Sequence, residues 1–346
     1  MKQAVLSEVL DRMDLAGLLA RISHVRVAVL GDLCLDVYWH ADMRQSELSR
    51  ETPHYPLPVI SERFSLGGAG NVCANAAMLG AQVTALGVVG CDWRADVLAR
   101  CCAQQDICAD KLIRDPERFT NAYCKPMRHG ICDVVYEDPR LDFCTLAPIG
   151  EQTEQRLLDA LDDLQADVLC VCDQLRFGCI TPRVREKILA LAESGLHVIA
   201  DSRDRIGLYR GVWIKPNELE GYAALHGNLP SQTLSLHECC ACAEALAEQT
   251  CSTVFMTLGA QGCVCAGCGE TTRVTAAKPP EKIDFVGAGD TMLAALSTAL
   301  AAGAEAEQAM AFANLCASVT IAKLGITGTA SANEVLDAAR RVSQTR

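Results

Sequence analysis

Asp284-Phe285-Val286-Gly287-Ala288-Gly289-Asp290-Thr291 is the most informative stretch of the sequence. It leads directly into a helical pattern of apolar residues that ends at Gly303. Small residues at a helix start leave backbone N–H groups unpaired at the positive end of the helix dipole, which favours anion binding. Asp290 could take a proton from an attacking hydroxyl while these N–H groups hold charge on a transferred group. Alternatively, Asp290 could simply cap the helix, and the segment alone favours neither interpretation.

A second glycine cluster, Gly67-Gly68-Ala69-Gly70-Asn71, precedes another helical pattern of small residues over 72–79. It fits a dinucleotide-binding fingerprint poorly, because Cys73 stands where Gly or Ala is required and no buried strand pattern precedes it. Two interpretations remain: close backbone packing at a helix start, or a polar ligand that approaches the paired glycines and Asn71. The sequence contains no Walker-type phosphate loop that could replace these segments as a phosphate site.

Buried-strand patterns alternate with helical patterns along much of the chain. The predicted elements are strands over 25–30, 166–172, 196–200 and 253–258, and amphipathic helices over 153–164 and 181–193. This alternation is typical of a parallel sheet covered by helices on both faces. The predicted fold class is therefore α/β, doubly wound and mostly parallel, and we expect one domain over residues 1–346.

Two stretches interrupt this alternation, residues 37–64 and 119–143. Both are short runs of alternating polar and apolar residues with several prolines, and we expect them to form a small antiparallel β appendage. Because α/β sheets bind ligands at the carboxyl ends of their strands, an appendage inserted after the first long strand is predicted to act as a lid. Its unpaired strand edges would also allow a homodimer to form through the lid.

The composition limits the classes of partner. The chain has 346 residues, of which 50% are hydrophobic, so it can bury a large core. The 43 acidic residues exceed the 31 basic ones, and the net charge of −12 argues against nucleic acid or an anionic membrane as the main partner. The sequence also lacks a stretch of about 20 uncharged apolar residues and the pattern of a signal peptide. A cytoplasmic protein is therefore expected.

The 20 cysteines are interpreted mainly as reduced, buried apolar residues, because many stand inside apolar runs and a chain of this size needs no disulfide scaffold. One alternative is a zinc site, with Cys263, Cys265 and Cys268 as three ligands. The fourth ligand would come from a nearby helical segment: Cys239, Cys240 or Cys242. The alternation of Cys263 and Cys265 favours a strand instead of this site.

Taken together, in this order and at about this separation, the two glycine-containing segments resemble the PfkB or ribokinase-like family of small-molecule kinases. The resemblance covers nearly the whole chain and implies a ribokinase-like fold. It implies that Asp290 is the catalytic base and that the anion hole is formed by Gly287, Ala288 and Gly289. The residues that it assigns to the sugar substrate are Asp36, Gly67, Gly68 and Asn71.

Shorter matches extend the resemblance toward the nucleotide. Asn217 and Glu220 resemble the family's Asn-x-x-Glu, whose glutamate binds magnesium through water. The residues that match the nucleotide site are Asn217, Thr257, Gly259, Gly262 and Asn314. Each match taken singly favours a structural role, as a helix start, a tight turn or a capped amide. The family also leaves open a monovalent cation near Asp284.

Within the family, the likeness is strongest to bacterial D-glycero-β-D-manno-heptose 7-phosphate kinases, for example in Leu35-Asp36-Val37-Tyr38-Trp39 and Ser49-Arg50-Glu51-Thr52-Pro53. Phe285 and the segments 173–176 and 201–203 depart from that pattern near the expected phosphate and substrate edges. These departures affect the identity of the sugar more than the kinase chemistry.

The resemblance implies an enzyme that uses ATP and Mg²⁺ to phosphorylate a hydroxyl of a sugar or sugar phosphate, with heptose 7-phosphate as one candidate. The alternatives are a kinase for another acceptor, such as a hexose, pentose or nucleoside, and a non-catalytic sugar or nucleotide sensor on the same scaffold. Three basic residues of the lid could bind a phosphate already on the acceptor, although exposed charges are more often only solvated: Lys125, Arg128 and Arg140.

Overall fold

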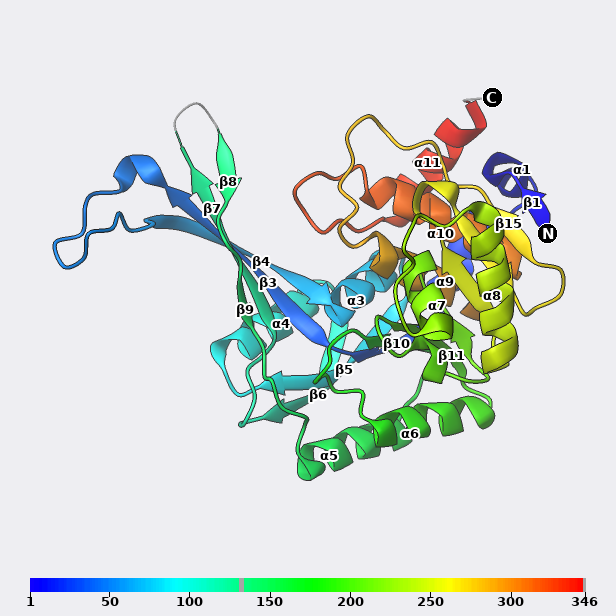
Figure 1. The fold of residues 1–346 in the computed structure, drawn as a ribbon, viewed down its shortest axis with the longest axis horizontal. Coiled ribbons are helices and arrows are strands. Elements are labelled where there is room, and N and C mark those ends of the chain that lie inside the picture. The colour runs from blue at the N-terminus through cyan, green and yellow to red at the C-terminus, as the bar shows by residue number, and fades with distance from the viewer. Residues whose placement is uncertain (131–133, 345–346) are drawn as a thin grey trace.

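The computed structural model describes residues 1–130 and 134–344 (Figure 1). Within these residues, one sheet has ten strands and a second, smaller sheet has five. The order of the large sheet in space is β1 (Lys2–Ala4), β15 (Thr272–Val274), β14 (Cys263–Ala266), β13 (Val254–Thr257), β12 (Trp213–Ile214), β11 (His197–Ser202), β10 (Val168–Asp173), β2 (Arg26–Gly31), β5 (Gln82–Gly90) and β6 (Ile107–Asp115).

The large sheet is parallel except at β14, which runs antiparallel to both β13 and β15. Successive residues of a strand point to opposite faces, so a strand buried on both faces is apolar throughout. In β2, Val27 and Val29 pack into one hydrophobic core, whereas Ala28 and Leu30 pack into the other. The prediction of a doubly wound, mostly parallel α/β fold is confirmed.

Helices cover both faces of the large sheet (Figure 1). The first core is built with α1 (Leu6–Asp11), α2 (Leu15–Ile22), α3 (Ala69–Met78), α4 (Trp93–Ala103), α9 (Ala288–Ala301), α10 (Ala306–Thr320) and α11 (Ala332–Gln344). The second core is built with α5 (Glu151–Asp162), α6 (Pro182–Glu193), α7 (Glu218–His226) and α8 (Leu236–Thr250). Short 3₁₀ turns complete the described elements: η1 (Met43–Gln45), η2 (Ile206–Leu208) and η3 (Gly259–Gln261).

The predicted strands and helices are found within a few residues of their expected bounds. The start of helix α6 could be predicted from the sequence because it has a capping residue and a proline in its first turn. The Thr181 side chain accepts a hydrogen bond from the Val184 N–H at 3.2 Å, and Pro182 occupies the first turn, where its missing N–H costs nothing. Helix α5 buries Leu157, Leu158 and Leu161 on one face, as their spacing predicts.

The predicted lid is the five-stranded sheet, which projects away from the large sheet (Figure 1). It pairs β4 with β3, β3 with β7, and β7 with both β8 and β9; the bounds are β4 (Val59–Gly68), β3 (Leu33–Asp42), β7 (Ala122–His129), β8 (Val135–Glu137) and β9 (Leu141–Phe143). The expectation of an antiparallel lid is wrong in one respect, because β3 and β7 run parallel. The two strands come from distant parts of the chain, so no hairpin fixes their direction.

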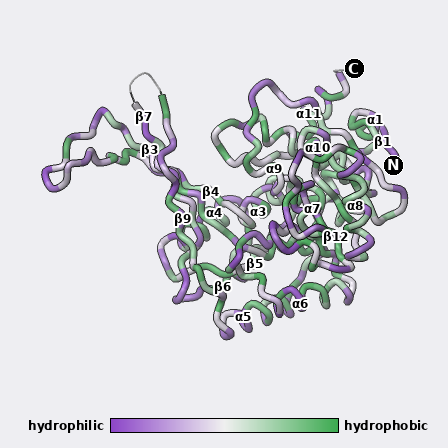
Figure 2. Tube along the Cα trace, viewed as in Figure 1, coloured by the Kyte–Doolittle hydropathy of each residue, from purple (hydrophilic) through white to green (hydrophobic). Residues whose placement is uncertain are grey.

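The described cysteines are free thiols, and most are buried. Cys263 and Cys265 point into the first core, while Cys239, Cys240 and Cys242 of α8 belong to the second core on the opposite face of the sheet. The described part of the chain contains no group of three or more His, Cys, Asp or Glu side chains placed to hold a metal ion. Figure 2 shows the apolar residues along the central strands and polar ones at the tip of the β3–β4 connection. Among the described residues, no helix is both long and apolar enough to cross a membrane.

Candidate active site

The predicted anion hole lies at the start of α9, where Gly287 has a left-handed backbone with φ of 82°. A Cβ atom here would lie 2.7 Å from Asn71 Nδ2 and 2.8 Å from Thr327 Cγ2, so this position requires glycine. The Ala288 N–H donates to the Phe285 carbonyl at 3.1 Å. Of the three predicted amides, this one is therefore engaged within the turn.

Asp290, in the first turn of α9, lies against α3. Its Oδ2 accepts a hydrogen bond from Asn71 Nδ2 at 2.7 Å, and the two residues are 219 positions apart in the sequence. One helical turn further along α3, Asn75 Oδ1 accepts from Thr291 Oγ1 at 3.0 Å. The two predicted segments thus meet through their polar side chains. Asn71, assigned to the sugar by resemblance, contacts the predicted base.

The environment of Asp290 raises its pKa above the ordinary value for an aspartate. Its side chain is only partly accessible to solvent, and this loss of hydration, with the negative charge of Asp201 nearby, raises the pKa of Asp290 to about 6. The hydrogen bond from Asn71 and the positive charge of Lys215 act in the opposite direction and keep the pKa from rising further. Asp290 is therefore ionised at neutral pH but binds a proton more readily than an ordinary aspartate.

Asp36 lies near the start of β3, where the lid joins the rest of the molecule. Its Oδ2 is 3.6 Å from Lys125 Nζ and accepts a weak hydrogen bond from Thr327 Oγ1 at 3.4 Å. A Cβ atom on Gly67 would lie 3.3 Å from the Asp36 carboxylate, and Gly68, with φ of 55°, precedes α3. The glycines let the Asp36 carboxylate lie directly against β4. Burial raises the pKa of Asp36, although Lys125 opposes that shift.

A buried ion pair that the sequence did not reveal lies beside this site. Lys215 Nζ is 3.1 Å from Asp201 Oδ2, and the two side chains are 3% and 8% exposed. A Cβ atom on Gly289 would be 3.9 Å from Lys215 Nζ, which places the ammonium group next to the start of α9. The nearby charges of Asp201 and Glu220 raise the pKa of Lys215 although burial lowers it. A lysine directly after a buried strand was the only sequence signal for this residue.

Asn217 and Glu220 form a reciprocal capping box at the start of α7. Asn217 Oδ1 accepts from the Leu219 and Glu220 N–H groups at 2.9 and 2.8 Å, and Glu220 Oε2 accepts from the Asn217 N–H at 2.9 Å. Burial and the charge of Asp201 raise the pKa of Glu220 to about 7. In this structure Asn217 and Glu220 therefore cap α7, and the charge of Asp201 lies close to Glu220. Binding of magnesium by Glu220 stays a prediction.

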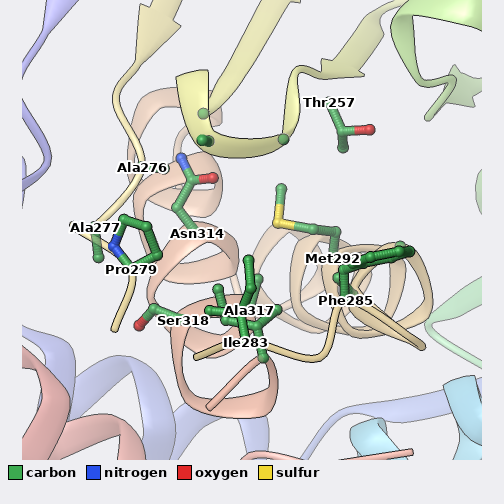
Figure 3. Close-up of a pocket in the computed structure, with 16 residues that line it drawn as sticks. Thr257, Ala276, Ala277, Pro279, Ile283, Phe285, Met292, Asn314, Ala317 and Ser318 are labelled. Carbon is green, nitrogen blue, oxygen red and sulfur yellow. The ribbon is translucent and has the colours of Figure 1, made fainter. Parts of the chain in front are cut away.

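An apolar pocket lies on the other side of the α9 start (Figure 3). The predicted residues Thr257, Gly259, Gly262 and Asn314 all line it, together with Ala288, Gly289, Phe285 and Met292 among others. Its lining is mostly apolar, as a site for a flat aromatic ring requires. Asn314 Nδ2 donates to the carbonyls of Val274 and Thr275 at 3.3 and 3.4 Å. Asn217 does not line this pocket.

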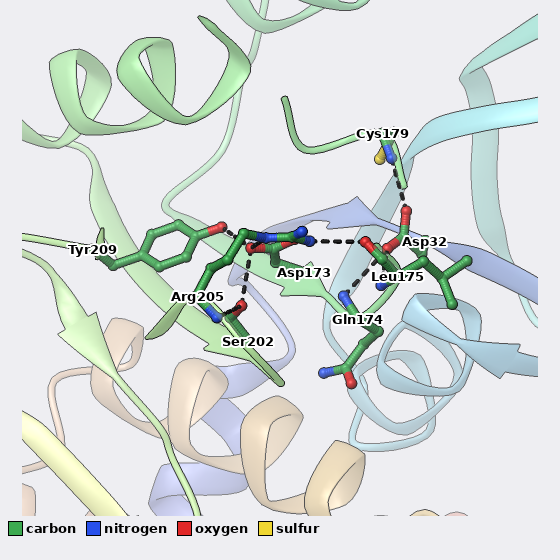
Figure 4. Close-up of polar contacts among 8 residues, drawn as sticks. All are labelled: Asp32, Asp173, Gln174, Leu175, Cys179, Ser202, Arg205 and Tyr209. Carbon is green, nitrogen blue, oxygen red and sulfur yellow. Dashed lines mark hydrogen bonds and ion pairs between the residues drawn. The ribbon is translucent and has the colours of Figure 1, made fainter. Parts of the chain in front are cut away.

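A buried polar network fixes the carboxyl ends of β2 and β10 (Figure 4). The Asp32 carboxylate accepts from the N–H groups of Gln174, Leu175 and Cys179 at 3.2, 2.8 and 2.8 Å. Next to it, Asp173 accepts hydrogen bonds from three side chains: Ser202, Arg205 and Tyr209. The segment 173–176, which departs from the heptose kinase pattern, therefore has a structural role here.

A doubly wound sheet with a lid, a carboxylate at a helix start and an adjoining apolar pocket could hold an acceptor, a base and a nucleotide close together, as phosphoryl transfer requires. Sequence comparison gives the class more narrowly. The chain matches the pfkB family of carbohydrate kinases over residues 27–171 and 207–333, and it belongs to this family. It is therefore a carbohydrate kinase, a phosphotransferase with an alcohol group as acceptor.

Curated relatives include proteins named bifunctional protein HldE. The one from Bradyrhizobium sp. (strain ORS 278) is 32% identical over 92% of this chain, and the one from Rhodopseudomonas palustris (strain BisB18) is 33% identical over 90%. The chain spans 64% and 63% of these relatives' lengths. The similarity therefore concerns about two thirds of each bifunctional protein.

Solved structures support the fold. Phosphofructokinase-2 from Escherichia coli in complex with potassium has a TM-score of 0.73 with 19% identity, covering 92% of this chain and 99% of that one. Arabidopsis thaliana ribokinase complexed with ribose and ATP has a TM-score of 0.66 with 18% identity and the same coverage. The ribokinase-like fold expected from the sequence is confirmed.

Proposed function

We propose that this carbohydrate kinase transfers the γ-phosphate of ATP to a hydroxyl of a sugar or sugar phosphate, with Asp290 as the general base. The observation that carries this proposal is the position of Asp290. It lies at the start of α9, beside the pocket that Gly289 lines and in contact with Asn71. This is where the end of a nucleotide's phosphate chain and a lid-bound acceptor would meet.

Each part of the site then has a chemical role. Asp36, Gly67 and Gly68 orient the acceptor under the lid, and Asp290 takes the proton of the acceptor hydroxyl as its oxygen attacks the γ-phosphorus and ADP leaves. The Gly287 and Gly289 amides at the start of α9 and the nearby Lys215 ammonium group would stabilise the negative charge of the transferred group. Because the Ala288 N–H is engaged with Phe285, Gly287 and Gly289 supply the remaining predicted amides.

The chemistry of the side chains suggests where the adenine ring, magnesium and a monovalent cation would bind. The apolar pocket with Thr257, Gly259, Gly262 and Asn314 suits the adenine ring. Magnesium would be held through water by Glu220 and Asp201, and when bound it neutralises charge on the phosphates. Both Asp284 oxygens accept N–H groups, from Val286 at 3.0 Å and Gly325 at 3.1 Å. A monovalent cation beside Asp284 remains a prediction, to be tested by activity in potassium against sodium.

Heptose 7-phosphate is the candidate acceptor, because the sequence resembles heptose 7-phosphate kinases and the HldE relatives share 30–33% identity with it. A kinase for another acceptor and a non-catalytic sensor remain the rival functions. The homodimer through the lid also stays a prediction, which sedimentation of the purified chain would test.

The experiment is magnesium-dependent ADP release from ATP over a panel of free and phosphorylated sugars, with the Asp290→Asn protein beside the wild type. We expect turnover on one sugar and a loss of about 10²–10⁴-fold or more in the variant. Nucleotide binding, measured by calorimetry, should be retained. Turnover equal to wild type in Asp290→Asn would disprove the assignment of the base, and ATP binding without turnover on any sugar would favour the sensor.

The fold of the Asp290→Asn protein serves as the control. The pKa of Asp290 in the folded state, about 6, lies above its ordinary value, so this carboxyl destabilises the fold progressively as the pH rises from that ordinary value to about 6 and destabilises it fully above that pH. The asparagine carries no charge and can still accept the hydrogen bond from Asn71. The variant should therefore unfold at the same or a higher temperature than the wild type at pH 8.

A further inference from the structure

One face of the lid is directed at the acceptor site. On β3, Leu35 and Val37 are buried in the first core. Since side chains alternate along a strand, Asp36 and Tyr38 share the opposite face. Asp36 there contacts Thr327, which lies between α10 and α11 outside the lid. Any side chain beside Tyr38 on this face is therefore close to the substrate position proposed for Asp36.

Two cations flank Tyr38 on this face. In the sheet register, Tyr38 pairs with Arg63 of β4 on one side and with Lys125 of β7 on the other. The Arg63 guanidinium carbon lies 3.7 Å from the centre of the Tyr38 ring, and Lys125 Nζ donates to the Tyr38 hydroxyl at 3.1 Å. Tyr38 is 6% exposed, so it is a rigid platform between the two charges.

Two other arginines of the lid, Arg128 and Arg140, are already paired with acids. Arg128 contacts the Asp138 carboxylate at 2.9 Å, and Arg140 contacts the two Asp142 oxygens at 2.6 and 2.7 Å. Both were candidates for a substrate phosphate on the sequence alone.

Arg63 differs from them, because among the described residues it forms no ion pair with a carboxylate. Its one polar contact given by the structure is a long hydrogen bond of 3.4 Å to the Gly325 carbonyl. Together, Asp36, Arg63 and Lys125 carry a net charge of +1.

We propose that Arg63, with Lys125, binds a phosphate ester already present on the acceptor and so determines the preference of this kinase for a phosphorylated sugar. The inference rests on the proposed function, because it extends the same acceptor site. Asp36 and Tyr38 are two residues apart on a strand, which corresponds to about 7 Å. A sugar whose hydroxyls contact Asp36 can therefore extend its distal phosphate to the Arg63–Lys125 pair. Arginine suits a phosphate through its fork of N–H donors.

The test compares the Arg63→Gln variant with wild type on matched acceptors, heptose 7-phosphate against the free heptose and fructose 6-phosphate against fructose. For the phosphorylated acceptor that is turned over, we expect kcat/KM to fall about 10- to 100-fold, mainly through KM. The KM for ATP should not change. Arg63→Lys should recover part of the loss, whereas Arg128→Gln, which removes a paired arginine from the same sheet, should have little effect.

Binding without ATP separates this inference from the proposed function. Calorimetric titration with the same four sugars and with gluconate should show tighter binding of a phosphate ester, lost in Arg63→Gln. That result supports the inference even if no sugar is turned over, in which case the proposed function fails alone. Turnover of free sugars only, a preference for the carboxylate of gluconate, equal losses in Arg63→Gln and Arg128→Gln, or no phosphate-dependent binding would each overturn the inference.

Discussion

At the scale of a single residue, two opposing influences determine the pKa of Asp290. Burial and Asp201 raise its pKa to about 6, and the hydrogen bond from Asn71 limits the rise. If ionised Asp290 is the base, kcat/KM should increase about tenfold per pH unit below pH 6 and become constant above pH 7. Asn71→Leu removes the stabilising donor, so the pKa should rise and the increase in activity should move to higher pH. Rate–pH profiles of both proteins measure this shift.

Thr291→Val is the matched control for that shift. It removes the hydroxyl that contacts Asn75 in the same contact between α3 and α9, at nearly constant volume. Its pH profile should coincide with that of the wild type. An Asn71→Leu profile that stays in place or moves to lower pH would contradict the assigned interaction.

At the scale of an element, α9 has a left-handed glycine at each end. Gly287 and Gly303 both have φ of 82°. A Cβ atom on Gly287 would have neighbours within 3 Å, whereas one on Gly303 would have none within 4 Å. Alanine should cost about 1 kcal/mol of stability at Gly303 through the backbone alone. Gly287→Ala should cost about 2–3 kcal/mol and also displace Asn71, so activity should fall only in this variant.

Urea unfolding and ADP release measure the two effects of these substitutions. Equal losses of stability in Gly287→Ala and Gly303→Ala would show that the contacts with Asn71 and Thr327 do not matter. Unchanged activity in Gly287→Ala would mean that the start of α9 tolerates displacement.

The polar contacts that join the carboxyl ends of β10 and β11 allow a second prediction at the scale of an element. Asp173 is fully buried and shares its hydrogen bonds with Arg205 and two hydroxyl groups (Figure 4). Arg205→Met would leave a buried carboxylate without its cation and should cost about 3–5 kcal/mol. The control is Arg26→Met, which breaks an exposed, solvent-screened pair with Asp167 and should cost far less stability. Similar losses in thermal unfolding for the two variants would refute this difference.

At the scale of the whole molecule, the residues proposed for the acceptor and those proposed for the nucleotide lie in different parts of the structure. Asp36 and Lys125 lie on the lid, whereas the apolar pocket is lined by residues from 257 to 321. Acceptor binding should therefore protect the exposed Arg50, in the β3–β4 connection, from trypsin more strongly than ATP does. Cleavage rates followed by mass spectrometry test this prediction. Equal protection by ATP alone would mean that the lid responds to the nucleotide.

Much of the fold could be predicted because its signals are local. The apolar run of β2, the cap of α6 at Thr181 and the small residues before α9 depend on neighbours in the sequence. The direction of β7 could not be predicted, since pairing with β3 is a contact between distant segments. The same limit applies to Lys215 and Arg63, whose importance depends on what surrounds them.

Local patterns in the chain were enough to establish the α/β class, the position of the lid and the two glycine segments, because backbone propensity and periodicity operate over a few residues. Two further properties became visible only in the folded molecule: Asn71 donates to Asp290, and Arg63 lacks an acidic partner among the described residues. These properties depend on distances between side chains and on burial. Folding determines both by bringing distant segments together, and no local pattern in the chain encodes them.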